Sequence, residues 1–209
     1  MSKLFFTSIL CFFLISMAAD DKKFVGEILY KNSFTDLKGN DLTQRLAPVL
    51  GLEQHYYTDG VNYKATDEKR DWRHLFLQKS KTYFYFNADK SAHKISVADI
   101  AQQNVKITKL DTREKIAGFD CKILQVDKSN TTTIYYYSAL VKTDPKIFAD
   151  HYFGEWNQYL EATDGAFPLK FVLTDRKNGF VWSAVATKVT KLKLTAKDFE
   201  FPREYTLVN

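Results

Sequence analysis

Residues 119–138 read FDCKILQVDKSNTTTIYYYS, and this stretch indicates how the chain folds. Its two runs rich in aromatic and β-branched residues, Phe119–Val126 and Thr132–Ser138, are typical of strands. The polar residues 127–130 between them are typical of a turn. Strands that are joined by so short a turn pair in the antiparallel sense. The stretch therefore predicts a β-hairpin.

The same hairpin signal recurs along the chain. Strand-like runs flank polar turns at residues 58–60, 79–81 and 175–179, and an opening strand covers Phe24–Phe34. The pattern predicts about ten strands in consecutive hairpins, with no linker between domains. We therefore expect a mainly β (α+β) fold. It should be one large curved antiparallel sheet, a half-barrel, with two or three helices covering its concave face.

Two segments have helical spacing. Leucines recur every four residues over Asp41–Leu50. Aromatic residues and a leucine recur every four residues over Asp144–Leu160, where Asp144 suits the N-cap and Pro145 the first helical position. The second segment is the clearer helix, and its apolar stripe is expected to pack on the sheet.

The first 18 residues read MSKLFFTSILCFFLISMA and are typical of a secretory signal peptide. A basic residue precedes an apolar run of about 14 residues, which is shorter than the roughly 20 needed to span a bilayer. We expect cleavage near Ala18, which leaves residues 19–209 as a single exported domain; an uncleaved N-terminal anchor is the alternative. Cys11 follows Leu10 rather than a small residue, so we do not expect it to carry a lipid.

Charge and cysteine content exclude other classes of protein. The net charge is +5, but basic and acidic residues alternate, as in residues 67–71, so no stripe for nucleic acid is expected. Weak, transient contact with an anionic membrane surface is compatible with this charge. Removal of the signal peptide leaves Cys121 alone, which rules out an internal disulfide. We interpret Cys121 as a small buried residue of its strand.

Common catalytic motifs are absent from the sequence. It contains no G-x-S-x-G, H-E-x-x-H, C-x-x-C or glycine-rich phosphate loop. His151 and Glu155 lie four residues apart and could ligate a metal, but two ligands do not complete a site, and we expect them to face solvent on a helix. We expect no cofactor, no metal and no enzymatic activity. Two convergent titratable groups with shifted pKa values in a cavity would favour an enzyme instead.

Aromatic residues are abundant, with 17 Phe, 12 Tyr and 3 Trp. Residues 83–86 are aromatic on both faces of their strand, so both faces need cover. One interpretation is an ordinary core with surface tyrosines. The other is a concave apolar groove for acyl chains or a hydrophobic peptide, because tyrosine tolerates a half-wet site. The residues that we predict for the wall or lid of this cavity are Phe84, Phe86, Tyr135, Tyr137, Phe148, Tyr152 and Trp156.

Four segments resemble the lipoprotein-carrier (LolA/LolB-like) superfamily of bacterial periplasmic proteins. They are the opening strand Phe24–Tyr30, the strand entry Ile116–Lys122, the strand start Phe167–Lys170 and the ending Leu194–Pro202. A glycine that commonly follows this ending is replaced here by Arg203. The resemblance implies a half-barrel whose concave apolar face is covered by helices and binds lipid or the acyl chains of lipoproteins.

These observations lead to two hypotheses. The first is a non-enzymatic periplasmic protein that holds a lipid or a lipoprotein acyl chain in a half-barrel cavity, in lipoprotein sorting or envelope maintenance. The second is an envelope module that binds a protein partner through an exposed aromatic patch. The first requires a cavity, whereas the second predicts a filled core.

Overall fold

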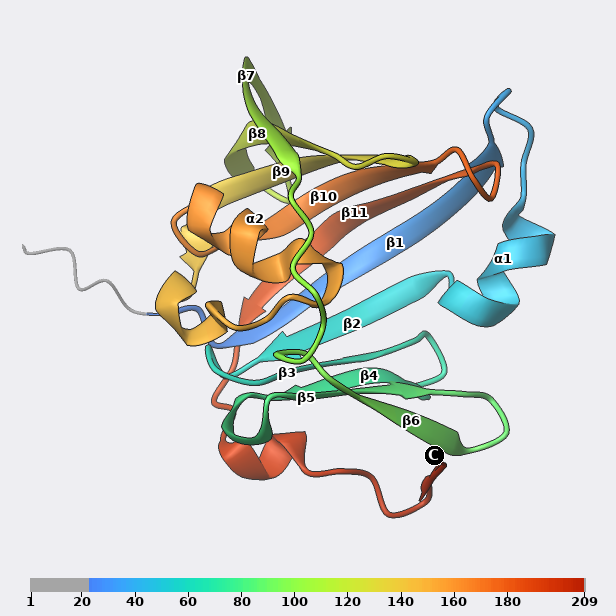
Figure 1. Cartoon of the computed structure of the whole chain (residues 1–209), viewed down its shortest axis with the longest axis vertical. Helices are drawn as coiled ribbons and strands as arrows, with labels where there is room; N and C mark the ends of the chain where they lie inside the picture. The colour runs from blue at the N-terminus through green and yellow to red at the C-terminus, as the bar shows by residue number, and fades with distance from the viewer. Residues whose placement is uncertain (1–22, 209) are drawn as a thin grey trace, which may run out of the picture.

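The computed structural model describes residues 23–208 (Figure 1). The predicted signal peptide therefore lies outside the described residues. The strands are β1 (Gly26–Asp36), β2 (Glu53–Thr58), β3 (Tyr63–Thr66), β4 (Trp72–Leu77), β5 (Thr82–Phe86), β6 (Ser91–Ser96), β7 (Lys106–Ile116), β8 (Phe119–Asp127), β9 (Thr131–Lys142), β10 (Ala166–Asp175), β11 (Phe180–Lys191) and β12 (Thr206–Leu207). The helices are α1 (Thr43–Leu50) and α2 (Trp156–Ala162), with 3₁₀ turns η1 (Gln78–Ser80), η2 (Pro145–Phe148), η3 (Phe153–Glu155) and η4 (Ala196–Phe199).

The strands form one curved sheet in the order β12-β6-β5-β4-β3-β2-β1-β11-β10-β9-β8-β7. Every pair of neighbours is antiparallel except β12 and β6, which are parallel. The sheet does not close, because β12 and β7 remain as its two edges. The predicted antiparallel half-barrel is thus confirmed, and β1 joins the N-terminal hairpins to the C-terminal strand β11.

The second predicted helix is wrong as a single element. Residues 145–162, which we call the lid, contain η2, η3 and α2 in succession and lie across the concave face of the sheet (Figure 1). The helix breaks because Gly154 and Glu155 both have left-handed φ angles, of 67° and 56°, which an α-helix cannot accommodate. The first predicted helix is confirmed as α1, which begins at Thr43. Among the described residues, no helix is long and apolar enough to cross a bilayer.

Buried residues form two clusters on opposite sides of the sheet. The larger cluster lies between the concave face and the lid and includes Phe76, Phe148 and Cys121. Cys121 is fully buried, as predicted, and burial raises the pKa of its thiol to about 11. In the smaller cluster Phe199 and Tyr205 cover β4–β6. Both belong to residues 192–208, which follow β11 and which we call the C-terminal segment. Both faces of these strands are therefore covered by protein.

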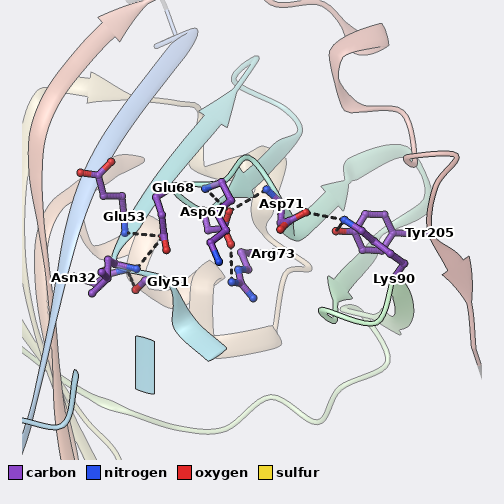
Figure 2. A network of polar contacts seen from close by, with 11 residues as sticks. Asn32, Gly51, Glu53, Asp67, Glu68, Asp71, Arg73, Lys90 and Tyr205 are labelled. Carbon is purple, nitrogen blue, oxygen red and sulfur yellow. Dashed lines mark hydrogen bonds and ion pairs between the residues drawn. The ribbon is translucent and has the colours of Figure 1, made fainter. Parts of the chain in front are cut away.

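A polar network anchors the C-terminal segment to the turn between β3 and β4 (Figure 2). The buried Asp67 carboxylate accepts hydrogen bonds from Arg73 Nη2 at 2.6 Å and from the backbone N–H of Asp71 at 3.0 Å. Asp71 in turn pairs with Lys90 Nζ at 2.7 Å, and this amine lies 4.8 Å from the centre of the Tyr205 ring. These contacts keep the C-terminal segment against the convex side of the sheet.

The turn between the lid and β10 depends on Gly165. Its φ is +80°, and a Cβ there would lie 1.9 Å from the carbonyl oxygen of Thr143. Gly179 has a similar φ of +73°, but a Cβ added there would meet no atom within 4 Å. The two glycines therefore share the backbone conformation but differ in the space for a side chain.

We predict that Gly165→Ala lowers the free energy of unfolding by clearly more than Gly179→Ala does. Gly179→Ala should lower the free energy of unfolding by about 1–2 kcal/mol, because alanine is strained at a left-handed φ. Gly165→Ala has the same strain and adds a clash between its Cβ and the carbonyl oxygen of Thr143. Urea denaturation of both variants measures the difference. Equal losses would mean that the backbone at Thr143 moves away without cost.

Candidate functional site

A cavity of about 440 Å³ lies between the concave face of the sheet and the lid. Its aromatic lining consists of Tyr30, Tyr56, Tyr63, Tyr83, Tyr135, Phe153, Trp156, Tyr159, Phe167, Phe171 and Trp182. Its polar side chains are those of Gln54, His74, Lys128, Thr131, Thr133, His151 and Glu155. The sheet supplies most of the wall, and the lid supplies the cover.

Strand alternation places these side chains on one face. Alternate residues Thr131, Thr133 and Tyr135 of β9 all line the cavity, as the period of two in a strand requires. Along β10 the lining changes from the buried Phe167 to the half-buried Leu173. The cavity thus has a buried part, which we call the inner end, around Tyr30, Tyr56, Tyr159, Phe167 and Pro168. It also has a half-buried part, which we call the mouth, around Gln54, Lys128, Thr131, Leu173 and Trp182.

Ring contacts around Tyr63 support the wall. The Tyr63 ring stacks on Tyr56 and on Phe76, with ring centres 5.5 and 5.1 Å apart, and meets His74 edge-on at 5.7 Å. Each of these rings is held on more than one side, so none can turn into the empty space without losing packing. The cavity therefore stays open although its lining is mostly apolar.

The lid is tied to the sheet by polar contacts as well as by packing. A hydrogen bond of 2.7 Å joins the Tyr63 hydroxyl to His151 Nε2 under the lid. An ion pair of 2.6 Å joins Lys128 Nζ to Glu155 Oε1 at the mouth. Further ties join Lys81 to Asp150 and the Gln78 amide to the Ile147 carbonyl. The position of the lid, and with it the volume of the cavity, depends on these contacts.

The expectation that His151 and Glu155 face solvent on one helix is wrong. His151 is only 2% exposed and bonds to Tyr63, whereas Glu155 pairs with Lys128. The break at Gly154 separates the two residues, so the spacing of four no longer places them on one helical face. Across the described residues, no group of three or more His, Cys, Asp or Glu side chains is arranged to hold a metal ion.

Apart from the Lys128–Glu155 ion pair at the mouth, the lining of the cavity carries no charge near neutral pH. Burial lowers the pKa of His74 and of His151 to about 4, so both imidazoles are neutral. Burial raises the pKa of Tyr56 and Tyr159 well above the usual value, so both phenols keep their protons. An uncharged, largely aromatic chamber results, with one ion pair at its mouth.

Five of the seven predicted wall residues fall into three groups. Tyr135 and Trp156 line the cavity. Phe148 and Tyr137 are buried in the core next to it and support the lining from behind. Tyr152 lies half-buried on the lid, outside the lining. The periodicity of residues 144–160 thus located the cover of the cavity but not each residue that faces it.

Phe84 and Phe86 lie on the opposite face of β5 from the cavity, and Tyr83 lines it instead. The ring of Phe84 meets Phe201 at 5.1 Å, and Phe86 meets Tyr205 at 4.7 Å, both in the C-terminal segment. Residues 83–86 alternate between the two faces of the strand as expected, but Tyr83 rather than Phe84 points into the cavity. The covering C-terminal segment lies too far along the sequence for the local pattern to include it.

Sequence reasoning missed several lining residues. Tyr56 belongs to an aromatic run, 55–57, whose alternation could have placed it on the same face as Gln54. His74 and His151 carry no local signal, because their burial comes from tertiary packing by Tyr63 and Tyr83. Only the folded arrangement reveals that two histidines share the cavity.

One protein-family model matches residues 65–205, which is more than half of the chain; its description is "Domain of unknown function (DUF4412)". The chain belongs to the DUF4412 family. The matched part of this DUF4412 protein runs from β3 into the C-terminal segment, so it includes the lid and the strands β8–β11 of the cavity wall. A comparison with curated protein sequences finds no match.

A search of solved structures finds similar folds at low sequence identity. PNGF-II matches with a TM-score of 0.51 and 18% identity over 88% of this chain, and the DUF4412 protein spans 31% of the PNGF-II chain. An uncharacterized conserved protein from Thermus thermophilus matches at 0.45, with 10% identity over 87% of this chain and 90% of that one. A LolA superfamily protein from Nitrosomonas europaea matches at 0.38, with 10% identity over 86% and 91%. These similarities concern the fold alone.

The two buried histidines predict a pH dependence of stability. Their pKa values are about 4 in the folded protein and near 6.5 when unfolded, so the unfolded chain binds protons first as the pH falls. The free energy of unfolding should decrease from about pH 6.5 to 4, by up to about 3 kcal/mol for each histidine. Carboxylates with lowered pKa values, such as Asp127 and Asp175, lose their contribution only below about pH 4.

Urea denaturation at a series of pH values measures this decrease. His151→Gln keeps a hydrogen-bonding group near Tyr63 but does not titrate, so it should remove about half of the decrease. A stability that stays constant between pH 6.5 and 4.5 in the unmodified protein would contradict the prediction.

Proposed function

We propose that this DUF4412 protein is a non-enzymatic, exported protein of the periplasm that binds an apolar ligand in its half-barrel cavity. The ligand class is a lipid or the acyl chain of a lipoprotein, and the role lies in lipoprotein sorting or envelope maintenance. The observation that carries the proposal is the cavity of about 440 Å³ with an aromatic lining and a cover tied over it.

The size and lining of the cavity support this ligand class. Small-molecule sites in proteins commonly have volumes of about 300–1,000 Å³ and mostly apolar walls. Each methylene group that leaves water for such a site contributes about 0.8 kcal/mol. A single acyl chain therefore has enough apolar surface for micromolar binding, and a space of this size favours one chain over a whole phospholipid.

Export and the periplasm enter the proposal through the sequence. Residues 1–18 have the pattern of a signal peptide, and four segments resemble periplasmic lipoprotein carriers. The fold agrees with that resemblance. Native mass spectrometry of the protein purified from the periplasm, followed by organic extraction, tests both the compartment and the cargo.

Two histidines with lowered pKa values in one cavity could also belong to an enzyme. Binding is the better account because a pKa near 4 makes each imidazole a weak base at neutral pH. The carboxylate of Glu155 is engaged by Lys128, and the Tyr63 hydroxyl by His151. Recovery of an added acyl ester without hydrolysis after prolonged incubation is the result expected of a carrier.

A substitution that fills the cavity should abolish binding. We predict that Thr133→Trp weakens the binding of a fluorescent fatty acid by at least about tenfold, because the indole would occupy space that the ligand needs. Ile134→Trp is the matched control, since strand alternation points the next residue of β9 to the other face. Fluorescence titration of both folded variants makes the comparison. Unchanged binding by Thr133→Trp would remove this cavity as the site.

The ion pair at the mouth should slow ligand exchange. We predict that Lys128→Met accelerates release of a bound fluorescent fatty acid several-fold, because Glu155 loses its tie to the sheet. Lys170→Met is the control, since Lys170 pairs with Glu114 at 2.9 Å and does not line the cavity. Stopped-flow displacement measures both rates. Equal release rates in the two variants would count against a gating role for this pair.

A protein-binding module is the second candidate. It is favoured by exposed apolar side chains around α1, where Val49 is 67% exposed, Leu37 51% and Leu52 43%. Such side chains can contact a protein partner. If Val49→Asp prevents capture of an envelope protein and leaves ligand binding unchanged, this surface has a role separate from the cavity. If the unmodified protein binds no apolar ligand, a protein-binding module is the better account of its function.

A further inference from the structure

Four buried polar atoms of the cavity lining form no hydrogen bond to any described residue. They are the hydroxyl groups of Tyr56 and Tyr159, the indole nitrogen of Trp156 and Nδ1 of His151. The hydroxyl groups and the indole nitrogen each carry a hydrogen that they can donate. Tyr56 belongs to β2 in the sheet, whereas Trp156 and Tyr159 belong to the lid. Unsatisfied groups from opposite walls therefore share one space.

Ring contacts show that the side chains carrying these groups are neighbours. The rings of Trp156 and Tyr159 stack with centres 5.2 Å apart. Phe167 lies beside both Tyr56 and Trp156, at 5.8 and 6.4 Å. Tyr30 adds to the raised pKa of both Tyr56 and Tyr159, so its hydroxyl lies within electrostatic range of the two others. The side chains that carry the unpaired donors therefore lie at the inner end of the cavity or, for Trp156, beside it.

Unpaired buried donors are costly. A buried donor without a partner costs about 1–3 kcal/mol, and folded proteins satisfy nearly all such groups. The indole N–H can only donate, and the phenols keep their protons at neutral pH. The group that completes this site must therefore accept hydrogen bonds.

The charge of the site decides which acceptor fits. His74 and His151 are neutral, and the nearest cation of the lining, Lys128, is paired with Glu155 at the mouth. A carboxylate or phosphate placed at the inner end would be buried without a counter-charge, which is strongly unfavourable. A carbonyl oxygen accepts hydrogen bonds and carries no net charge.

We propose that the inner end binds the carbonyl group of an uncharged acyl ester or amide, with hydrogen-bond donors drawn from Tyr56, Tyr159 and Trp156. The hydrocarbon chain then lies along Phe171 and Leu173 toward the mouth. This inference rests on the proposed function and narrows its ligand to acyl compounds without a free acid group. Apolar volume alone would not distinguish these compounds from plain hydrocarbons.

The test compares three probes on the purified protein at pH 8. These are methyl laurate, laurate and tetradecane, which are similar in length. The first carries a neutral ester acceptor, the second a carboxylate and the third no acceptor, and displacement of Nile red reports their binding. We expect methyl laurate to bind about tenfold more tightly than tetradecane, and more tightly than ionised laurate, because only the ester supplies a neutral acceptor.

Substitutions that remove a hydrogen-bond donor but leave an aromatic ring show which side chains are responsible for the preference for the ester. Tyr56→Phe combined with Tyr159→Phe should cost about tenfold in affinity for methyl laurate and leave tetradecane unchanged. Trp156→Phe is a second, independent variant that removes the indole donor. Tyr85→Phe is the control, because Tyr85 is 38% exposed on β5 and does not line the cavity.

The outcomes separate this inference from the proposed function. Equal affinity for ester and alkane, tighter binding of laurate, or full ester affinity in both donor variants would overturn the carbonyl site and leave lipid binding intact. Failure of the unmodified protein to bind any of the three probes would overturn the proposed function itself. Circular dichroism of each variant shows whether it is folded before its affinity is compared.

Discussion

The hydrogen bond between Tyr63 and His151 holds the central contact between lid and sheet. It joins β3 to a residue 88 positions later, and both of its side chains are buried. The Tyr63 ring also touches Phe148 and Trp156 of the lid, at 6.3 and 6.4 Å. Because an open half-barrel leaves its concave face uncovered, the cavity exists only while these contacts hold the lid in place. Burial keeps both partners neutral, so the bond carries no charge that would need solvation.

Local sequence was sufficient for the strands and for their antiparallel order. Alternating aromatic runs and short polar turns are local features, and they identify hairpins such as β8–β9 without tertiary information. Local sequence was not sufficient to predict which face of a strand points into the cavity. Phe84 and Tyr83 have similar hydrophobic character, and only the packing of Phe201 and Tyr205 decides which of them turns away from the cavity. That packing joins segments more than a hundred residues apart, where periodicity gives no guidance.

The lid shows how a pattern can locate a surface and still miss its shape. Apolar residues at every fourth position correctly placed Phe148 and Leu160 against the sheet. The pattern predicted one helix because it does not register backbone conformation, and Glu155 is an unusual residue for a left-handed φ. Its ion pair with Lys128 helps to hold that conformation. Residues that are held in a left-handed backbone conformation by their surroundings are frequent at sites that bind a ligand or move. Such a conformation is therefore in keeping with a lid over a cavity.

The aromatic composition and the polar interior of the cavity have one physical origin. A wall of leucines would be flexible enough to collapse into a space of this size, whereas stacked rings support one another and keep it open. Tyrosine and tryptophan provide such rings, and each also brings a hydrogen-bond donor into the interior. At Tyr30 the protein itself satisfies that donor, since the hydroxyl bonds to the carbonyl of Pro168 at 2.5 Å. At Tyr56 and Tyr159 it does not, although the same phenol chemistry and burial apply. The difference between satisfied and unsatisfied tyrosines within one wall distinguishes a site prepared for a polar atom of a ligand from a core that is merely aromatic.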